Sequence, residues 1–260
     1  RNKAVLSSTG VSTFGANTGT SSNNAGLSQA NMGKTSSFSG WSFGELGSGA
    51  TWVVIGADGA LNNPGNKAGG TSPMLLSEYS TTITNTHQLQ LMTLDLAQTY
   101  TLGNDVSAAT TGRTDEGVWG ENGFIAVGGN NASDTPFSGT FDGRGHTIDS
   151  LWMQETGNDY AGLFGRTSAD ARIANVSLTN LTITSLSGND IPANGVGGLV
   201  GDNAGVISHV SISGSINPNG IMSAGGIAGR NEGSISEAQS SVSVSVNDDF
   251  DAAQGVGGLV

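Results

Sequence analysis

GVGGLVGDNAGVIS, residues 195–208, is the stretch that decides the fold, because altered copies of it recur along the chain. A close copy, GGIAGRNEGSIS, occupies residues 225–236, AGLFG at residues 161–165 repeats the head, and GVGGLV at residues 255–260 repeats it again. The Gly-Leu or Gly-Ile pairs begin at Gly162, Gly198, Gly226 and Gly258, so successive copies are 36, 28 and 32 residues apart. A period of roughly 20–50 residues is typical of repeat architectures, in which each unit stacks on its neighbours.

The segment after each glycine-rich head has the two-residue period of a β-strand with one buried face. In residues 206–216 serines alternate with an apolar face that consists of Val210, Ile212, Gly214 and Ile216. Residues 176–183 and 242–246 alternate in a similar way. Because such a strand cannot bury its apolar face alone, successive units must cover one another. We therefore predict an all-β fold, a parallel β-helix that the general crossover rule makes right-handed.

The recurrent glycines are predicted to have a structural role at the corners between strands. A corner needs glycine where φ is positive, or where the neighbouring unit comes so close that no Cβ fits. The residues assigned to this role are Gly162, Gly165, Gly198, Gly201, Gly226, Gly229 and Gly258.

This repeat resembles the GLUG motif of large bacterial surface exoproteins of the filamentous haemagglutinin type. Further segments resemble the ordered series that leads into GLUG arrays in such adhesins, at residues 86–92, 100–106, 119–127, 137–148 and 161–165. Residues 26–32, 36–43 and 73–75, with Trp52, resemble the segment that closes a preceding array. The resemblance covers about residues 26–260. It implies export by two-partner secretion from a Gram-negative cell, and a biofilm matrix adhesin is similar in organisation.

Four parts are expected along the chain. Residues 1–37 are the tail of a preceding array, residues 38–80 an aromatic-rich closing segment, residues 81–158 the lead-in to the next array, and residues 159–260 the repeat units. A short helix is expected at residues 86–91, with Thr86 as its cap. Because the chain begins without a start residue and stops inside a motif, we expect it to be part of a longer protein.

Composition excludes several classes of function. The formal net charge is −12 and the nine basic residues are scattered, so we expect no nucleic-acid partner. No apolar run is long enough to span a bilayer, which argues against membrane insertion. The chain has 42 glycines, no cysteine and 12% charged residues, about half the usual share of 25%. Such a Gly-, Ser- and Asn-rich surface fits an exported rod.

An enzyme is the rival class, because parallel β-helices also host polysaccharide lyases and glycoside hydrolases. Stacked units could hold two carboxylates about 6.5–9.5 Å apart, the separation that inverting hydrolysis uses. The densest polar cluster is Asp142, Arg144 and His146, but turn chemistry explains these residues without catalysis. His209 alternates with Val210 and is predicted to face outward. We expect no catalytic residue and no cofactor.

Two binding sites remain as candidates. Asp248, Asp249 and Asp251 offer hard oxygen ligands for calcium, although the spacing is not that of an EF-hand and a solvated acidic loop is the favoured reading. Trp41 and Trp52, with Trp119, are candidate platforms for a sugar ring, and core packing is the favoured alternative.

These features predict a non-catalytic segment of a secreted adhesin at the cell surface, a rigid stalk that supports cell–cell or cell–matrix adhesion in biofilm. Its expected partners are extracellular polysaccharide or a neighbouring cell surface, with an outer-membrane secretion partner for the parent protein. The alternatives are direct exopolysaccharide binding by the rod and, less favoured, a polysaccharide lyase or glycoside hydrolase.

Overall fold

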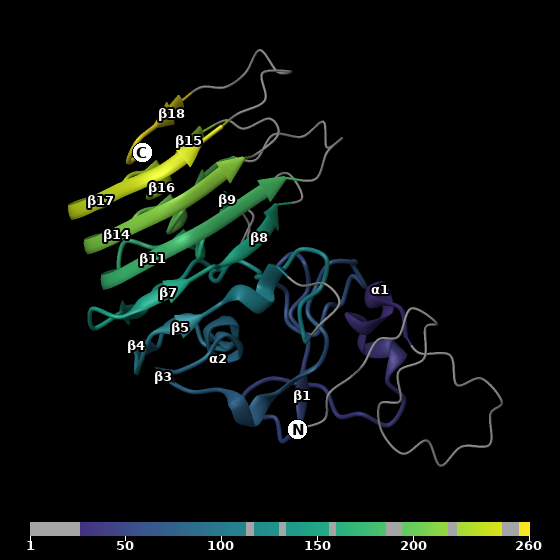
Figure 1. Cartoon of the computed structure of the whole chain (residues 1–260). Helices are drawn as coiled ribbons and strands as arrows, with labels where there is room; N and C mark the ends of the chain where they lie inside the picture. The colour runs from purple at the N-terminus through teal and green to yellow at the C-terminus, as the bar shows by residue number, and fades with distance from the viewer. Residues whose placement is uncertain are drawn as a thin grey trace.

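The computed structural model of the chain describes residues 27–112, 117–129, 134–155, 160–185, 194–217, 223–245 and 255–260. Across these residues the fold is all-β with parallel sheets and little helix, as Figure 1 shows. The predicted all-β class is therefore confirmed. Most of the predicted tail segment, residues 1–26, lies outside the described residues.

Each copy of the repeat contributes one strand to each of three parallel sheets. The first copy comprises β9 (Tyr160–Ala161), β10 (Phe164–Thr167) and β11 (Arg172–Ser185). The second comprises β12 (Gly195–Gly197), β13 (Val200–Asn203) and β14 (Val206–Asn217). The third comprises β15 (Ser223–Gly225), β16 (Ala228–Asn231) and β17 (Ser234–Val244), and β18 (Gly255–Gly257) begins a fourth. The sheets run in the orders β9-β12-β15-β18, β10-β13-β16 and β11-β14-β17, so each strand pairs with its counterpart in the next copy.

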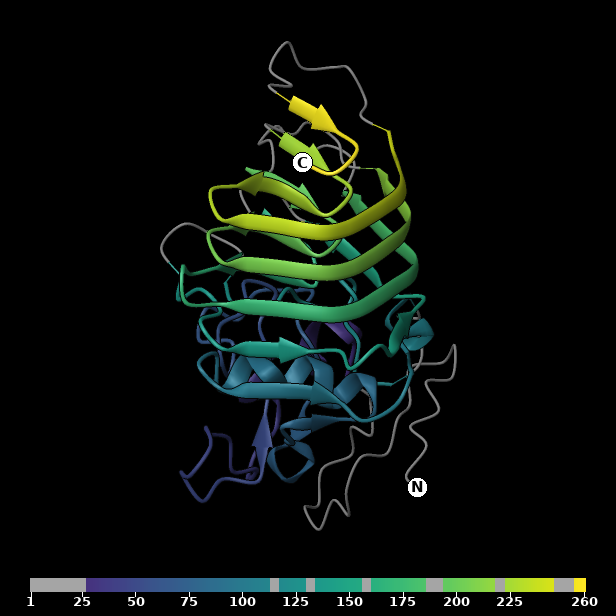
Figure 2. The same cartoon turned by 90° about the vertical axis from the view of Figure 1, so that its left-hand side faces the viewer.

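The sheet of long strands continues into the lead-in. β6 (Thr140–Asp142), β7 (Thr147–Asp149) and β8 (Trp152–Glu155) all pair in parallel with β11. Below them lie β4 (Thr99–Leu102), β5 (Val106–Ser107) and β3 (Thr82–Ile83). Figure 2 shows these strands as bent ribbons stacked from the lead-in to the last repeat. One sheet therefore joins the two regions.

The N-terminal part of the described chain contains short elements of several kinds. Its helices are α1 (Gln29–Met32), α2 (Thr86–Leu91) and the 3-10 turns Thr35–Ser37, Leu76–Glu78, Met92–Leu94 and Ala109–Gly112. β1 (Trp52–Val53) and β2 (Met74–Leu75) form an antiparallel pair. The helix predicted at residues 86–91 is confirmed, but its predicted cap is wrong, because the side chain of Asn85 accepts from the Gln88 amide at 3.0 Å while Thr86 donates to the Ser107 carbonyl.

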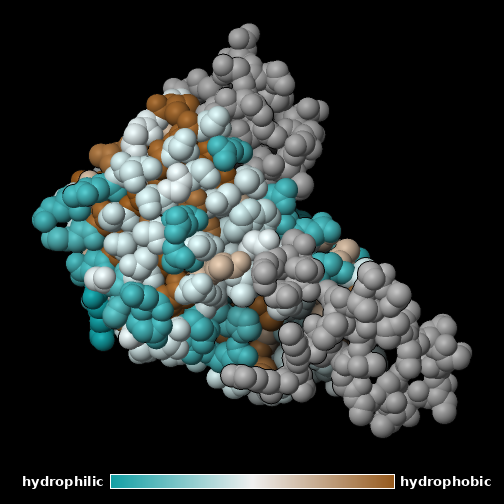
Figure 3. All heavy atoms as spheres, in the orientation of Figure 1, coloured by the Kyte–Doolittle hydropathy of each residue, from teal (hydrophilic) through white to brown (hydrophobic). Residues whose placement is uncertain are grey.

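The interior consists of columns of equivalent side chains, one from each stacked strand. Register places Tyr100, Phe141, Ile173, Ile207 and Ile235 in one column, and the first four are buried. Ile148, Leu178 and Ile212 form another buried column. Outside, the long sheet is mainly polar (Figure 3). The predicted alternation along residues 206–216 is thus confirmed, with Val210, Ile212 and Ile216 inside.

Gly162, Gly198, Gly226 and Gly258 lie outside the short strands, as predicted for corner glycines, whereas the corner assignment of Gly165, Gly201 and Gly229 is wrong because they lie inside β10, β13 and β16. Equivalent register brings Gly162, Gly198, Gly226 and Gly258 into line. A Cβ on Gly198 would lie 2.6 Å from the Gly226 carbonyl oxygen and 2.8 Å from the Ile212 side chain. None of the seven predicted glycines has a positive φ, and at six of them, all but Gly258, a Cβ would lie within 3.0 Å of another atom, so close approach is the reason for glycine at those six.

A second glycine column makes the short strands pack closely. A Cβ on Gly201 would lie 2.7 Å from the Gly165 carbonyl oxygen, and one on Gly229 would collide with the Val196 amide. At the last position, Gly258, a Cβ would meet no atom within 4 Å. The requirement for glycine therefore depends on the neighbouring unit, which is the following one for Gly198 and the preceding one for Gly201 and Gly229.

The long strands share a left-handed residue at one equivalent position, and β11 has a second one at Asn180. Asn175, His209 and Glu237 have φ of 56°, 54° and 48°, and occupy equivalent positions on β11, β14 and β17. On β14 this places Ser208 and His209 both outward between the buried residues Ile207 and Val210. His209 is therefore exposed, as predicted, at a corner of the stack.

Candidate functional site

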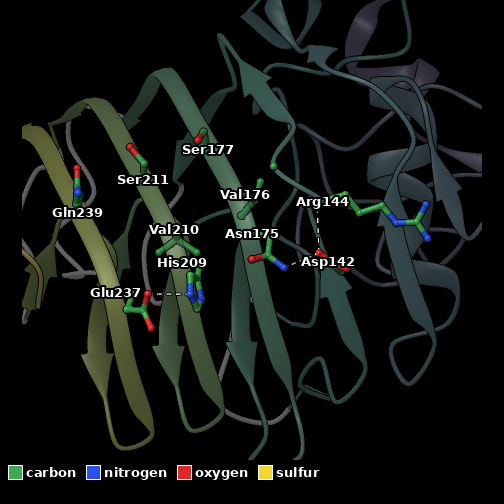
Figure 4. A pocket seen from close by; sticks show the side chains of 11 residues that line it. Asp142, Arg144, Asn175, Val176, Ser177, His209, Val210, Ser211, Glu237 and Gln239 are labelled. Carbon is green, nitrogen blue, oxygen red and sulfur yellow. Dashed lines mark hydrogen bonds and ion pairs between the residues drawn. The ribbon is translucent and has the colours of Figure 1, made fainter.

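A shallow groove of about 650 Å³ runs along this corner on the outer face of the long sheet (Figure 4). It crosses from β6 over β11 and β14 to β17. Its outward side chains are Asp142, Arg144, Asn175, Ser177, His209, Ser211, Glu237 and Gln239. Successive strands present them because the left-handed residues recur at one position in every unit.

Within the groove, His209 and Glu237 form an ion pair between neighbouring units. The imidazole Nε2 lies 2.8 Å from a Glu237 carboxylate oxygen, and the side chains are 55% and 69% exposed. Exposed pairs contribute little to stability. This pair therefore orients two side chains without holding the units together.

Asp142 occupies the lead-in end of the groove and is held by two donors. Its Oδ1 accepts from Asn175 Nδ2 at 2.9 Å and from the Arg144 backbone amide at 2.9 Å. These hydrogen bonds, the one from Asn175 first, lower the pKa of Asp142. Because the carboxyl is ionised at neutral pH, it lacks the proton that a general acid needs.

The polar cluster of Asp142, Arg144 and His146 does not converge on one point. His146 Nδ1 instead lies 3.2 Å from Asp105 Oδ1, and the Arg144 guanidinium extends away from Asp142 in Figure 4. The pKa of Asp105 is lowered by the Thr147 amide first and then by His146. Asp142 accepts from the Arg144 amide within its turn, and His146 instead contacts Asp105, so the geometry favours turn stabilisation over a catalytic arrangement.

A second carboxylate joins the lead-in to the first repeat. Asp149 accepts from Thr179 Oγ1 and Asn180 Nδ2, both at 2.7 Å, and from Ser150 Oγ at 2.8 Å. These bonds lower its pKa, with Thr179 as the largest cause. Asp142 and Asp149 therefore fasten β6 and β7 to β11.

The three tryptophans proposed for glycan contact are in different environments. Trp41 and Trp52 are half-buried and stack on each other, with ring centroids 4.4 Å apart and planes at 30°. Trp119 is 1% exposed, packs against Phe124 and donates to Thr110. The prediction of a glycan contact at Trp119 is wrong, because its ring is buried in the core and cannot contact a sugar.

Sequence reasoning missed a buried polar ladder at another corner. Asn203 is 1% exposed, accepts from Thr167 Oγ1 at 2.8 Å and donates to Asn231 Oδ1 at 2.7 Å. The sequence held a signal for it, since these residues all stand two positions after the repeated glycine, in GRT, GDN and GRN. Beside them, Arg166 Nε and Asp202 Oδ2 lie 3.6 Å apart, and Tyr160 and Asp202 raise the pKa of Arg230.

Asp248, Asp249 and Asp251, the calcium candidates, lie outside the described residues. Within the described part of the chain, no three His, Asp or Glu side chains gather as a metal would require. The helices in that part are all too short or too polar to cross a bilayer.

Comparison with known proteins gives one partial likeness. Halomucin of Haloquadratum walsbyi is 40% identical over 121 residues, which is 46% of this chain and 1% of Halomucin. The chain thus spans about a hundredth of the length of that relative. No family model matches the chain, and no solved structure matches it.

Proposed function

We propose that the chain is a non-catalytic stalk segment of a large exported surface adhesin, in which GLUG-type units stack as a right-handed parallel β-helix. The observation that supports this most is the register: β11, β14 and β17 pair in parallel, residue by residue, along most of their length. Each added unit lengthens the stack by about one strand spacing, ~4.8 Å, without a new core.

Mechanical stiffness follows from the direction of the hydrogen bonds. The strands lie across the stack, so their backbone hydrogen bonds run along it, and several rows in three sheets share a load. The buried ladder of Thr167, Asn203 and Asn231 adds side-chain bonds in the same direction. A stalk with this geometry holds a binding region away from the cell.

The setting of the proposal is a long protein outside the cell. The likeness to Halomucin supports great length, because the aligned residues are only 1% of that protein. We place the segment on a secreted adhesin exported with an outer-membrane partner, and extracellular polysaccharide or another cell surface as what the whole protein contacts. The resemblance of the repeat to GLUG arrays supports this placement.

Single-molecule force spectroscopy on the 260-residue chain tests the stalk. Units 28–36 residues apart should extend in separate steps of about 100–125 Å, at ~3.5 Å per residue, each at a clear force peak. Extension without any peak, as for an unstructured linker, would contradict the proposal. D142N serves as a second check, because a polysaccharide panel should show no turnover in either chain.

The half-buried pair of Trp41 and Trp52 favours sugar binding as a second candidate. Trp41 and Trp52 stack on each other and Trp41 also packs against Phe38, but each tryptophan keeps partly exposed surface on which the apolar face of a sugar could lie. A glycan array on the wild type and on W41A/W52A tests it, and identical profiles would exclude this role.

A further inference from the structure

Two asparagines on the outer face of β11 begin the tripeptide Asn-x-Ser/Thr. They are Asn175, in Asn-Val-Ser, and Asn180, in Asn-Leu-Thr. A third copy, at Asn131, lies outside the described residues. This tripeptide is the acceptor motif for N-linked glycans when it lies at the surface of an exported protein.

Both asparagines lie where a transferase can reach them. Each is exposed, and each has a left-handed φ, 56° at Asn175 and 53° at Asn180, which breaks the strand at a corner. The middle residues Val176 and Leu181 are 2% and 1% exposed, so the core fixes them. The acceptor amide and the hydroxyl two residues on consequently point to the same side, as Figure 4 shows for Asn175 and Ser177.

The hydrogen bonds of the two amides are compatible with a glycan. Asn175 Nδ2 donates to Asp142 at 2.9 Å, and Asn180 Nδ2 donates to Asp149 at 2.7 Å. A side-chain amide has two N–H groups, and a glycan replaces only one. The other can keep its carboxylate, so modification leaves the junction between lead-in and repeat intact.

We propose that Asn175 and Asn180 are acceptor sites for N-linked glycans. Nδ2 bonds to the anomeric carbon of a sugar carried as a phosphate ester, the bond from that carbon to the phosphate oxygen breaks, and the phosphate carrier leaves with the electron pair. The amide proton passes to a base of the cell's transferase, and nothing is oxidised or reduced. A glycan on Asn175 would cover the corner groove, which that residue lines, and a glycan on Asn180 would lie farther along the same strand.

The equivalent corner of the next unit supplies a matched gain-of-site variant. His209 has the same left-handed conformation and is followed by Val210 and Ser211, so H209N creates Asn-Val-Ser at that position. Asparagine is well suited to this conformation, and only an exposed ion pair is lost. If the corner geometry makes an acceptor, this variant gains a third one on the described strands.

The test is mass spectrometry of the full chain, secreted by a host that attaches N-linked glycans and compared with chain from a host that does not. Glycopeptides are expected at Asn175 and Asn180. S177A should remove the first, T182V the second, T182S should retain the second, and H209N should add one. Glycosylation at these sites requires export, so this inference rests on the proposed function. In the experiment the expression host exports the chain, and the mechanical test of the stalk uses unmodified chain, so the two proposals can fail independently.

Peptides spanning residues 172–185 that are recovered wholly unmodified, from cells that glycosylate a reference secreted protein, would overturn the proposal. Modification of Asn175 without modification of H209N would overturn the argument from corner geometry. Urea unfolding gives an independent readout: the glycosylated and unmodified chains should have the same midpoint, and a lower midpoint on glycosylation would contradict the retained bonds to Asp142 and Asp149.

Discussion

The repeat units and the lead-in share one sheet but fill their interiors differently. A single interior column runs from Tyr100 and Phe141 in the lead-in to Ile173, Ile207 and Ile235 in the repeats. In the repeats, similar units stack on one another, and aliphatic side chains fill most of the interior, with Tyr160 and Phe164 as the buried aromatic residues of the first unit. The lead-in lacks such units, and it fills the space with aromatic rings and the buried face of α2. The interior of the repeats is thus determined by the stacking of similar units, and that of the lead-in by the size of its aromatic side chains.

The largest expected effect comes from adding a side chain where two units meet. G198V places its Cβ 2.6 Å from the Gly226 carbonyl oxygen and 2.8 Å from Ile212, so strands or side chains must shift. Overpacking of a fixed interior costs about 3 kcal/mol. Urea unfolding should show a free energy of unfolding lower by that amount, and therefore a lower midpoint.

The control for this change is G258V, at the equivalent position of the last copy. A Cβ there meets nothing within 4 Å, so its unfolding midpoint should equal that of the wild type. Equal losses in the two variants would show that glycine is needed for its backbone and not for close approach.

The next largest effect should come from the buried ladder of Thr167, Asn203 and Asn231 in the repeats. N203A removes the partner of Thr167 Oγ1 and of Asn231, and leaves polar groups without a bond inside the stack. Each such group costs roughly 1–3 kcal/mol, so we expect a loss of about 2 kcal/mol. N231A, at an exposed residue, should cost less than about 0.5 kcal/mol by thermal unfolding. If N231A loses as much unfolding free energy as N203A, the buried hydrogen bonds of Asn203 are not the source of the stabilisation.

How far the sequence predicts the molecule differs between the same two regions. In the repeats, the period of Gly162, Gly198 and Gly226 and the alternation after Val206 predict the strands, their faces and their parallel stacking. In the lead-in only the longest patterns were predictable, because strands of two or three residues carry too little alternation to detect. The glycan contact predicted at Trp119 was wrong because residues 117–127 carry no periodic pattern that shows which way the ring points, and the ring packs on Phe124 in the core.

The groove was hidden from sequence reasoning for a conformational reason. The left-handed corner falls on Asn175, His209 and Glu237, three different residue types, so no residue pattern marks it. The alignment of the copies reveals the position but not the φ. The polar ladder was more accessible, since Asn203 and Asn231 are the same residue in two successive copies.

A smaller effect is expected where the two regions join. The pKa values of Asp142 and Asp149 are lowered in the folded protein by donors on β11. Their contribution is therefore full above the unfolded pKa of about 3.9 and is lost as the pH falls through the lower folded values. Because both carboxylates are largely solvated, each should contribute less than about 1 kcal/mol.

Unfolding followed between pH 7 and pH 2 checks this junction. The wild type should lose stability below about pH 4, and D142N/D149N should lose less over the same window. If the free energy of unfolding of the double variant falls with pH as steeply as that of the wild type, other carboxylates cause the acid sensitivity. Asp142 and Asp149 would then contribute no measurable stability to the junction between lead-in and repeats.

The smallest expected effect concerns the ion pair within the repeats. E237Q removes the negative partner of His209, but the two side chains are 69% and 55% exposed, so the unfolding free energy should change by less than about 0.5 kcal/mol at pH 6. The matched variant at the junction, D149N, replaces the Oδ2 acceptor of Ser150 Oγ by an NH2 group and removes the negative charge that strengthens the bonds from Thr179 and Asn180, so it should cost more under the same conditions. A larger loss in E237Q than in D149N would reverse the comparison, because the repeats would then depend on charge at their corner, where stacking and close approach alone should suffice.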